Sequence, residues 1–367
     1  MSDTGDWWDG FWGKIKHSPA ILPAHYQVLP SHVDRTQGEP FRRDQHYFVV
    51  KVNQIFLKYD RQFWTTYAPM ALVVSEFDYD EQAKVVPFVV GPSLLEKDKI
   101  ELPSGFVFSD TKVAGIHPYK GGGLKLTVIL YQVKRIDLAK KMLSMVERVA
   151  SVLDFSQTLA AYVKISGVLV DIVETIISSD DDNQPLIGLR KEFDPIDDFS
   201  PGYFALIDSR NVKIDVSRLW VTDNKLLAGD SRETAEPFTD ANYVLYSVRQ
   251  TKARDDVTKL GFYQQWKVAL AESSSHEPKK WKSARASWAS LCQMMSLSPD
   301  LAFAQVGDLA KECWAKMEER HDLATATHAK MGAGKEGVDP AMFEDTELQG
   351  ISERLNRIRT TSVSILD

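Results

Sequence analysis

Residues 47–57, with the sequence YFVVKVNQIFL, decide the fold class of this chain. Most of them are β-branched or aromatic, in partial alternation with polar residues, and this pattern predicts a β-strand. Several short strands without helical periods between them favour an antiparallel β-sandwich or a partly open barrel over a parallel βαβ sheet. The further strands of this sheet are expected at residues 70–77, 84–90, 105–108 and 124–134.

The spacing of apolar residues changes from strand-like to helical at Arg135. Residues 135–178 predict two helices that form a hairpin and cover the sheet. The second of these helices, residues 156–177, carries an apolar stripe. The expected fold class is therefore α+β: an antiparallel sandwich or open-barrel-like N-terminal half covered by a helical hairpin, followed by a small β patch and a helical C-terminal region.

Seven segments follow from these changes of pattern. The helical C-terminal region contains Ser298-Pro299, which is typical of a helix start. Residues 325–347 are small, Gly-containing and weakly apolar, which is typical of a flexible linker. The expected segments are an extended aromatic and Pro-rich N-terminal segment (1–44), a β-rich domain (45–134), the helical hairpin (135–178), loops with a second β patch (179–252), a helical C-terminal region (253–324), the flexible linker (325–347) and a short C-terminal helix and tail (348–367).

Composition and charge restrict the class of protein. The 367 residues carry a formal net charge of −7 at pH 7, which opposes non-specific attraction to nucleic acid, so nucleic acid is not an expected partner. Residues 1–12 contain three aspartates and no apolar run of the kind that a secretory signal needs, so a cytoplasmic protein is expected. The most apolar segment, residues 157–177, is interrupted by charges and does not fit a membrane-spanning helix.

No motif of catalysis, metal binding or cofactor binding stands out in the sequence. The glycines at 121–123 precede strand residues and not a helix, which favours a hairpin turn over a phosphate-binding loop. Cys292 and Cys313 lack the spacing of a zinc site and lie on apolar faces of expected helices, where small buried residues are common. We therefore predict no cofactor, no metal site and no assignable catalytic residue.

One candidate polar site consists of Asp110, His117 and Tyr119. These residues lie near the end of an expected strand, just before the glycine turn. An enzyme could assemble a site around His117 from residues that are distant in sequence. The simpler interpretation is that His117 is a loop imidazole bonded to the backbone.

Four large aromatic residues gather near the N-terminus: Trp7, Trp8, Phe11 and Trp12. A segment this short has no core of its own. Its side chains therefore either pack onto this protein's own surface or anchor a partner, because aromatic residues dominate interface hot spots. The sequence leaves both interpretations open, with self-docking slightly favoured.

These observations favour a non-enzymatic scaffold or adaptor subunit that binds other proteins of an intracellular, bacterial assembly. One alternative is a membrane-perturbing effector that acts only after a trigger such as proteolysis, which would release the helix at residues 156–177 to a bilayer surface. The linker at residues 325–347 would suit such cleavage. A second alternative is an enzyme with a site around His117.

Overall fold

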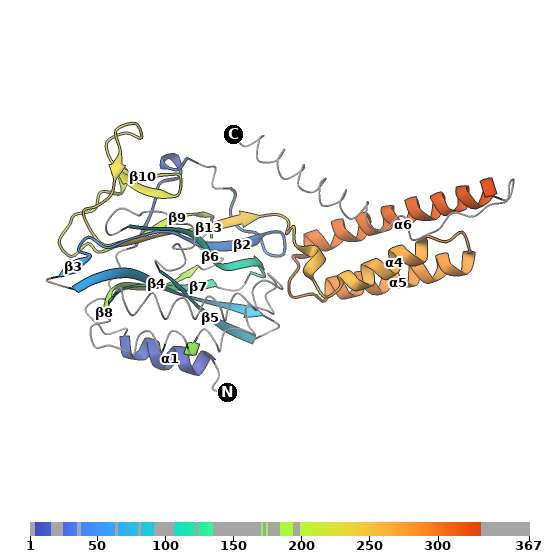
Figure 1. Ribbon diagram of the computed structural model, residues 1–367, viewed down its shortest axis with the longest axis horizontal. Helices are drawn as coiled ribbons and strands as arrows, with labels where there is room; N and C mark the ends of the chain where they lie inside the picture. Colours follow the sequence, from blue (N-terminus) through green and yellow to red (C-terminus); the bar gives the residue numbers. More distant parts are fainter. Residues whose placement is uncertain are drawn as a thin grey trace. The chain divides into compact units, whose positions relative to one another are not determined.

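The computed structural model describes residues 4–15, 25–34, 38–62, 65–79, 82–91, 106–121, 124–134, 170–171, 174, 184–193 and 199–331. The chain divides into two compact units, Met1–Ala253 and Arg254–Asp367. The first, the β unit, contains three antiparallel sheets among its described residues, and none of these sheets is closed (Figure 1). The second, the helical unit, contains three described α-helices. The α+β class expected from the sequence is confirmed.

The central sheet of the β unit has the strand order β1-β9-β13-β2-β6. The second β patch of the sequence does not stand apart, because β13 pairs with β2 from Tyr243↔Phe56 to Thr251↔Tyr47. Pairing between strands so far apart in the chain leaves no local pattern in the sequence. The strands of this sheet are β1 (His25–Gln27), β9 (Gly202–Ile207), β13 (Tyr243–Thr251), β2 (Tyr47–Phe56) and β6 (Phe106–Pro118).

Two further sheets lie on the two faces of the central sheet. The second sheet has the order β5-β4-β7-β8, and the short β3 pairs with the start of β4. The small sheet has the order β10-β11-β12. The strands are β3 (Arg61–Gln62), β4 (Thr65–Tyr79), β5 (Gln82–Val90), β7 (Leu124–Lys134), β8 (Gln184–Phe193), β10 (Leu219–Thr222), β11 (Lys225–Ala228) and β12 (Glu236–Pro237); the 3₁₀ turns η1 (Pro30–His32) and η5 (Val216–Arg218) accompany them.

Strand alternation places apolar residues on both faces of the central sheet. In β13, Val244 and Tyr246 belong to the core shared with the second sheet, whereas Tyr243 and Leu245 belong to the core shared with the small sheet. Successive strand residues point to opposite faces, so a strand buried on both sides needs an almost continuous apolar run. The three-layer arrangement of sheets explains why the β13 sequence shows such a run instead of a clear alternation.

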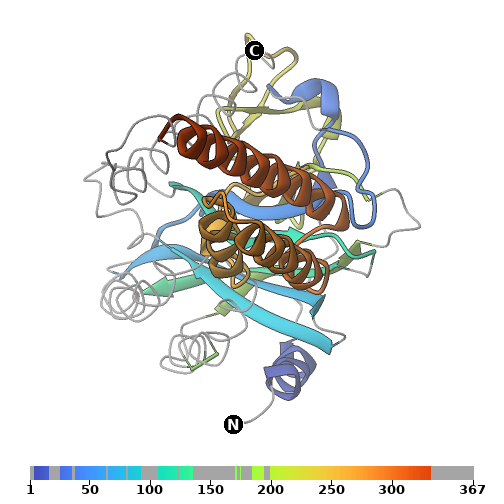
Figure 2. The same cartoon turned by 90° about the vertical axis from the view of Figure 1, so that its right-hand side faces the viewer.

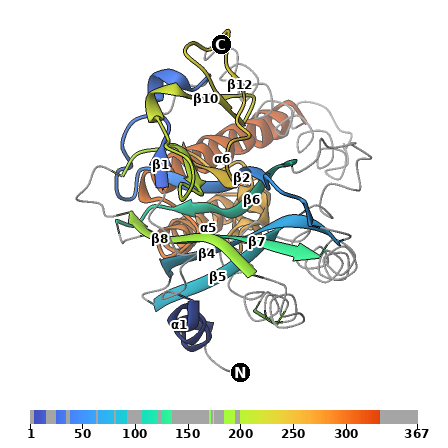
Figure 3. The ribbon, with the colours of Figure 1, turned by 90° about the vertical axis from the view of Figure 1, so that its left-hand side faces the viewer.

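Helix α1 (Thr4–Ile15) lies on the side of the second sheet that faces away from the central sheet (Figures 1 and 3). The sequence predicts an extended segment over residues 1–44, and this prediction is wrong for residues 4–15. The aromatic side chains recur at a spacing of four residues, which places Trp8 above Trp12 and Trp7 above Phe11 on a helix. Their ring centroids are 5.8 Å and 5.3 Å apart, respectively.

The helical unit contains α4 (Tyr263–Ser273), α5 (Pro278–Ser296) and α6 (Phe303–Met331), preceded by the 3₁₀ turn η6 (Val257–Lys259). The three helices lie side by side (Figure 2) around one apolar core. Cys313 is fully buried in this core, and burial raises the pKa of its thiol to about 12. The expectation that the two cysteines pack as small apolar residues agrees with this position and with the half-buried Cys292 beside the same core.

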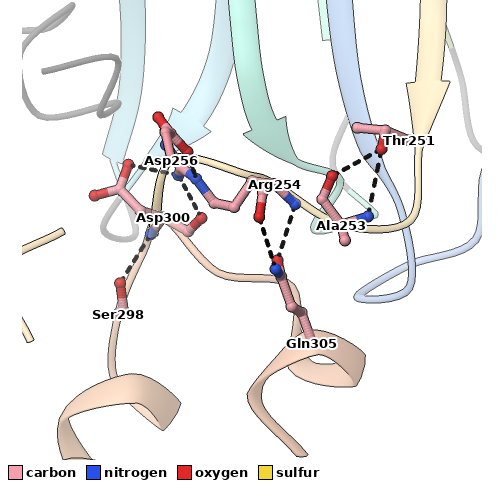
Figure 4. Close-up of polar contacts among 7 residues, drawn as sticks. All are labelled: Thr251, Ala253, Arg254, Asp256, Ser298, Asp300 and Gln305. Atoms are coloured by element: carbon pink, nitrogen blue, oxygen red, sulfur yellow. Dashed lines mark hydrogen bonds and ion pairs between the residues drawn. The ribbon is translucent and has the colours of Figure 1, made fainter. Parts of the chain in front are cut away.

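A buried ionic network holds the beginning of the helical unit (Figure 4). The guanidinium of Arg254 donates through Nε and Nη2 to the two carboxylate oxygens of Asp256, at 2.6 Å and 2.8 Å. Its Nη1 donates to the carbonyl oxygen of Asp300 at 2.8 Å. The side-chain amide of Gln305 bonds both the backbone N–H and the backbone carbonyl of Arg254. We call these four residues the Arg254 network.

The start and end of α6 differ from the sequence-based expectation. Ser298-Pro299 predicts a helix start, but α6 begins at Phe303, because the preceding turn presents Asp300 to Arg254. The expected linker at residues 325–347 overlaps α6, which continues to Met331. The rest of that linker and residues 348–367 lie outside the described residues. So does the expected hairpin at 135–178, apart from residues 170–171 and 174.

Candidate functional site

A group of polar side chains lies on the face of the central sheet that meets the small sheet. Its members are Lys51 and Asn53 of β2, Asp110 of β6, Tyr203 of β9, Arg249 of β13 and Asn224 of the turn between β10 and β11. We call these six residues the polar cluster. Four strands of the central sheet and one hairpin of the small sheet therefore contribute side chains to this cluster.

Asp110 is the centre of the polar cluster and its one described carboxylate. Its Oδ2 accepts a hydrogen bond from Lys51 Nζ at 2.7 Å, and its Oδ1 accepts one from Asn53 Nδ2 at 2.9 Å. Arg249 Nη2 approaches the same Oδ1 at 3.3 Å. Asp110 has a φ of 37° and lies where the register of β2 and β6 shifts. The irregularity turns its carboxylate toward β2.

The β10–β11 turn fastens the small sheet onto this cluster. Asp223 and Asn224 have φ values of 50° and 62°, as a two-residue type I′ hairpin turn requires. Asn224 Oδ1 accepts hydrogen bonds from Tyr203 Oη at 2.7 Å and from Arg249 Nη2 at 2.8 Å. A second clip lies nearby, where Gln54 Oε1 accepts from the backbone N–H of Leu226 at 2.8 Å. Arg249 therefore contacts both Asp110 and the turn of the β10–β11 hairpin.

Two buried polar atoms in or next to the polar cluster have no described hydrogen-bond partner. Asn53 Oδ1 is buried, and no hydrogen-bond partner lies within reach of it in the described part of the chain. The same holds for Oγ of Ser247, a fully buried residue that is directly opposite both Lys51 and Tyr203 in the sheet register. Buried polar atoms are normally bonded, so each of these two atoms calls for water or another partner.

The three residues of the candidate polar site expected from sequence have different described neighbours. Asp110 belongs to the polar cluster. His117 is 1% exposed, and its ring packs against Phe48 and Phe77 at centroid distances of 5.5 Å and 4.9 Å. Tyr119 is 3% exposed and packs with an aromatic group that includes Phe41. Asp110 thus lies in the polar cluster, whereas His117 and Tyr119 both pack against the core that is shared with the second sheet.

The sequence missed five members of the polar cluster. A partial signal exists, since Lys51 and Asn53 are two of the three polar residues that interrupt the apolar run of β2, the third being Gln54. Asp223-Asn224 is also a typical pair for a tight hairpin turn. Nothing in the local sequence connects these positions with Tyr203 or Arg249, because the sheet pairing brings them together.

The N-terminal aromatic residues pack on the β unit itself. Trp8 is 1% exposed, and its Nε1 donates to Glu76 Oε1 at 3.1 Å; Arg190 pairs with the other oxygen of Glu76 at 2.6 Å. Trp7, Phe11 and Trp12 are partly buried against the same core. Self-docking thus occupies Trp8, whereas a partner contact through the partly exposed three stays a prediction.

The described residues were searched for metal-binding groups and for membrane-spanning helices. Within the described ranges, no three His, Cys, Asp or Glu side chains are grouped closely enough to hold a metal ion. Among the helices that the structure describes, none has both the length and the apolar composition that a bilayer crossing demands. Comparison of the chain with protein-family models, curated proteins and solved structures finds no match.

Proposed function

We propose that this protein is a non-enzymatic scaffold or adaptor subunit of a cytoplasmic multi-protein assembly. The observation that carries the proposal is a set of exposed apolar side chains in the helical unit. Met294 is 42% exposed, Leu297 is 75% exposed and Phe303 is 67% exposed. These three residues are close together in the chain, around the connection from α5 to α6, and exposed apolar side chains that gather in one place mark protein interaction sites. We call these three residues the α5–α6 patch, because they lie at the end of α5, in the following connection and at the start of α6.

The division of the chain into two units supports an adaptor role. Each unit has its own apolar core, so each can present a separate surface without depending on the other for its packing. Apolar side chains of this size contribute binding free energy when a partner removes them from water. The α5–α6 patch would therefore bind an apolar surface of another protein.

Affinity purification of the full chain from native lysate, followed by quantitative mass spectrometry, tests this function. We expect specific partners with the wild-type protein and their loss with the double variant Leu297→Ser/Phe303→Ser. Leu323→Ser is the matched control, since Leu323 lies on α6 and is 59% exposed outside the patch. Identical partners for all three proteins, or no specific partner of the wild type, would rule out the proposal.

The two alternatives from the sequence remain predictions. Release of residues 156–177 to a membrane is tested by dye leakage from anionic liposomes, with the full chain before and after limited proteolysis; absence of leakage in both removes it. An enzymatic site around His117 would require a substrate to reach a side chain that is 1% exposed. We therefore rank it below the adaptor role.

A further inference from the structure

The polar cluster carries more positive than negative charge. Lys51 and Arg249 contribute two cations, and Asp110 contributes the one carboxylate among the described members. The cluster thus has a formal charge of +1, whereas the whole chain carries −7. A partly enclosed positive charge without a full complement of anions attracts an anionic group.

Both cations keep hydrogen-bond donors that the protein does not use. All described contacts of the Arg249 guanidinium involve Nη2, so Nε and Nη1 have no described acceptor. Lys51 Nζ, with three hydrogens, has one described acceptor, Asp110 Oδ2. Nε and Nη1 lie on different sides of the guanidinium, with Cδ between them, so each offers a single directed donor to a carboxylate or phosphate oxygen.

Both side chains are partly open to solvent. The side chains of Lys51 and Arg249 are 22% and 28% exposed, respectively. Beneath them, the buried Ser247 hydroxyl has no described hydrogen-bond partner and is directly opposite Lys51 in the sheet register. The cluster therefore combines two partly exposed cationic side chains with a buried hydroxyl that has no described hydrogen-bond partner.

From these observations we infer that the polar cluster binds the anionic oxygen group of a ligand, a carboxylate or a phosphate, between Lys51 and Arg249. The inference is independent of the α5–α6 patch and assigns a ligand site to the β unit. Lys51 supplies a point charge, and Arg249 supplies one directed donor from Nε or from Nη1. Asp110 orients both cations as a positioning residue.

Isothermal titration of sodium phosphate and of sodium acetate into the full-length protein, at neutral pH and constant ionic strength, tests the site. Sodium chloride gives the baseline, because exposed charges are screened by any salt. We expect saturable binding of at least one anion. The stronger of the two distinguishes a phosphorylated ligand from a carboxylate ligand.

Three variants locate the binding. Lys51→Gln and Arg249→Gln should each weaken it by about tenfold or more, as expected for loss of a charge-assisted hydrogen bond. Lys51→Arg should restore most of the affinity. Arg210→Gln is the control, since Arg210 is a 43% exposed arginine of the same unit that pairs with Asp208. It should bind as the wild type does.

Two results would overturn the inference. One is the absence of saturable phosphate or acetate binding in the wild type. The other is undiminished binding in Lys51→Gln, even if Arg249→Gln binds less, because Arg249 also holds the β10–β11 turn and its loss alone could act through the hairpin. Circular dichroism of Lys51→Gln, whose described contact is with Asp110, checks that the β unit stays folded.

Discussion

The Arg254 network and the polar cluster use the same pair of chemical groups in opposite ways. Arg254 is 0% exposed, and all three of its terminal guanidinium nitrogens donate to acceptors of the helical unit. Arg249 is 28% exposed, and a single nitrogen makes its described contacts. One arginine has its donors satisfied within the fold, whereas the other keeps donors for a ligand.

Both sites contain an ion pair, so an ion pair alone does not distinguish a structural site from a binding site. The two sites differ in how deeply the arginine is buried and in how many of its donors are bonded. A desolvated arginine needs every donor bonded, because water cannot replace a missing acceptor. A half-exposed arginine can leave donors to solvent at little cost. Stability measurements should therefore respond strongly to the Arg254 network and weakly to the polar cluster.

The largest effect is expected for Arg254→Ala. This change leaves Asp256, 7% exposed in its side chain, without its cation, and loss of one partner of a buried pair costs about 3–5 kcal/mol. Urea unfolding of the full chain followed by far-UV circular dichroism would show the helical transition at lower urea. The control is Arg218→Ala, an exposed pair with Asp230, which should change little. A cost below about 1 kcal/mol for Arg254→Ala would break the comparison.

The next effect concerns pH and extends the comparison to a partly buried histidine of the β unit. His25 bonds Tyr246 Oη at 2.6 Å, and burial, with a smaller contribution from Lys191, lowers the pKa of His25 from 6.5 to about 4. The unfolded chain therefore takes up a proton near pH 6.5 and the folded chain only near pH 4. Stability is full above pH 6.5 and falls by about 3 kcal/mol as the pH decreases to 4.

The variant His25→Phe isolates this contribution, because Phe keeps a ring between Phe204 and Tyr246. The difference in unfolding free energy between wild type and variant should shrink or reverse in favour of the variant as the pH falls from 6.5 to 4. Parallel pH profiles for the two proteins would show that His25 is not held neutral by the fold.

A smaller effect is expected for Arg249→Gln. The change removes a charge-assisted hydrogen bond to Asn224, but both side chains keep access to solvent or to other donors, so we expect a loss of about 1 kcal/mol. Thermal unfolding at low and at high salt measures it, and the loss should diminish at high salt. A loss as large as that of Arg254→Ala would mean that the polar cluster is a structural network.

The smallest effect is expected for a substitution in α6 that alters neither the Arg254 network nor the polar cluster. A Cβ added at Gly307, in the first turns of α6, meets nothing within 4 Å. Gly307→Ala should stabilise the helical unit by up to about 1 kcal/mol, because alanine has the higher helix propensity. Gly115→Ala is the opposing case, since its φ is 103° and its Cβ would lie 2.6 Å from Phe48 O. If both variants behaved alike, the local geometry described for these glycines would be wrong.

The sequence predicts local structure well where one pattern dominates. The strand at residues 47–57 corresponds to β2, and the alternation of apolar residues identifies the strands around it. The pattern does not predict the N-terminal helix although Trp8 and Trp12 show its spacing, because neighbouring glycines and aspartates favour an irregular segment. The pattern places the start of α6 too early, because the backbone carbonyl of Asp300 accepts a hydrogen bond from the buried Arg254.

The candidate site was predictable only in part. Asp110 was identified from its place near the glycine turn, and it does lie in a polar constellation. Its partners Tyr203 and Arg249 come from strands that pair with one another across long stretches of chain. Such non-local pairing, and the register shift that turns Asp110 toward β2, have no counterpart in the spacing of residues along the sequence.

Side-chain nitrogen NMR of the full-length protein with labelled arginine tests the central claim most directly. Each arginine Nε–H gives its own signal, and comparison with Arg249→Gln identifies that of Arg249. On addition of phosphate, and separately of acetate, at constant ionic strength, this signal should move in a saturable way with at least one of the two anions. The signal of Arg254, whose Nε is bonded to Asp256 at 2.6 Å, should stay in place. An Arg249 signal that stays in place with both anions, or an equal movement of the Arg249 and Arg254 signals, would contradict the distinction between an open polar cluster and a closed Arg254 network.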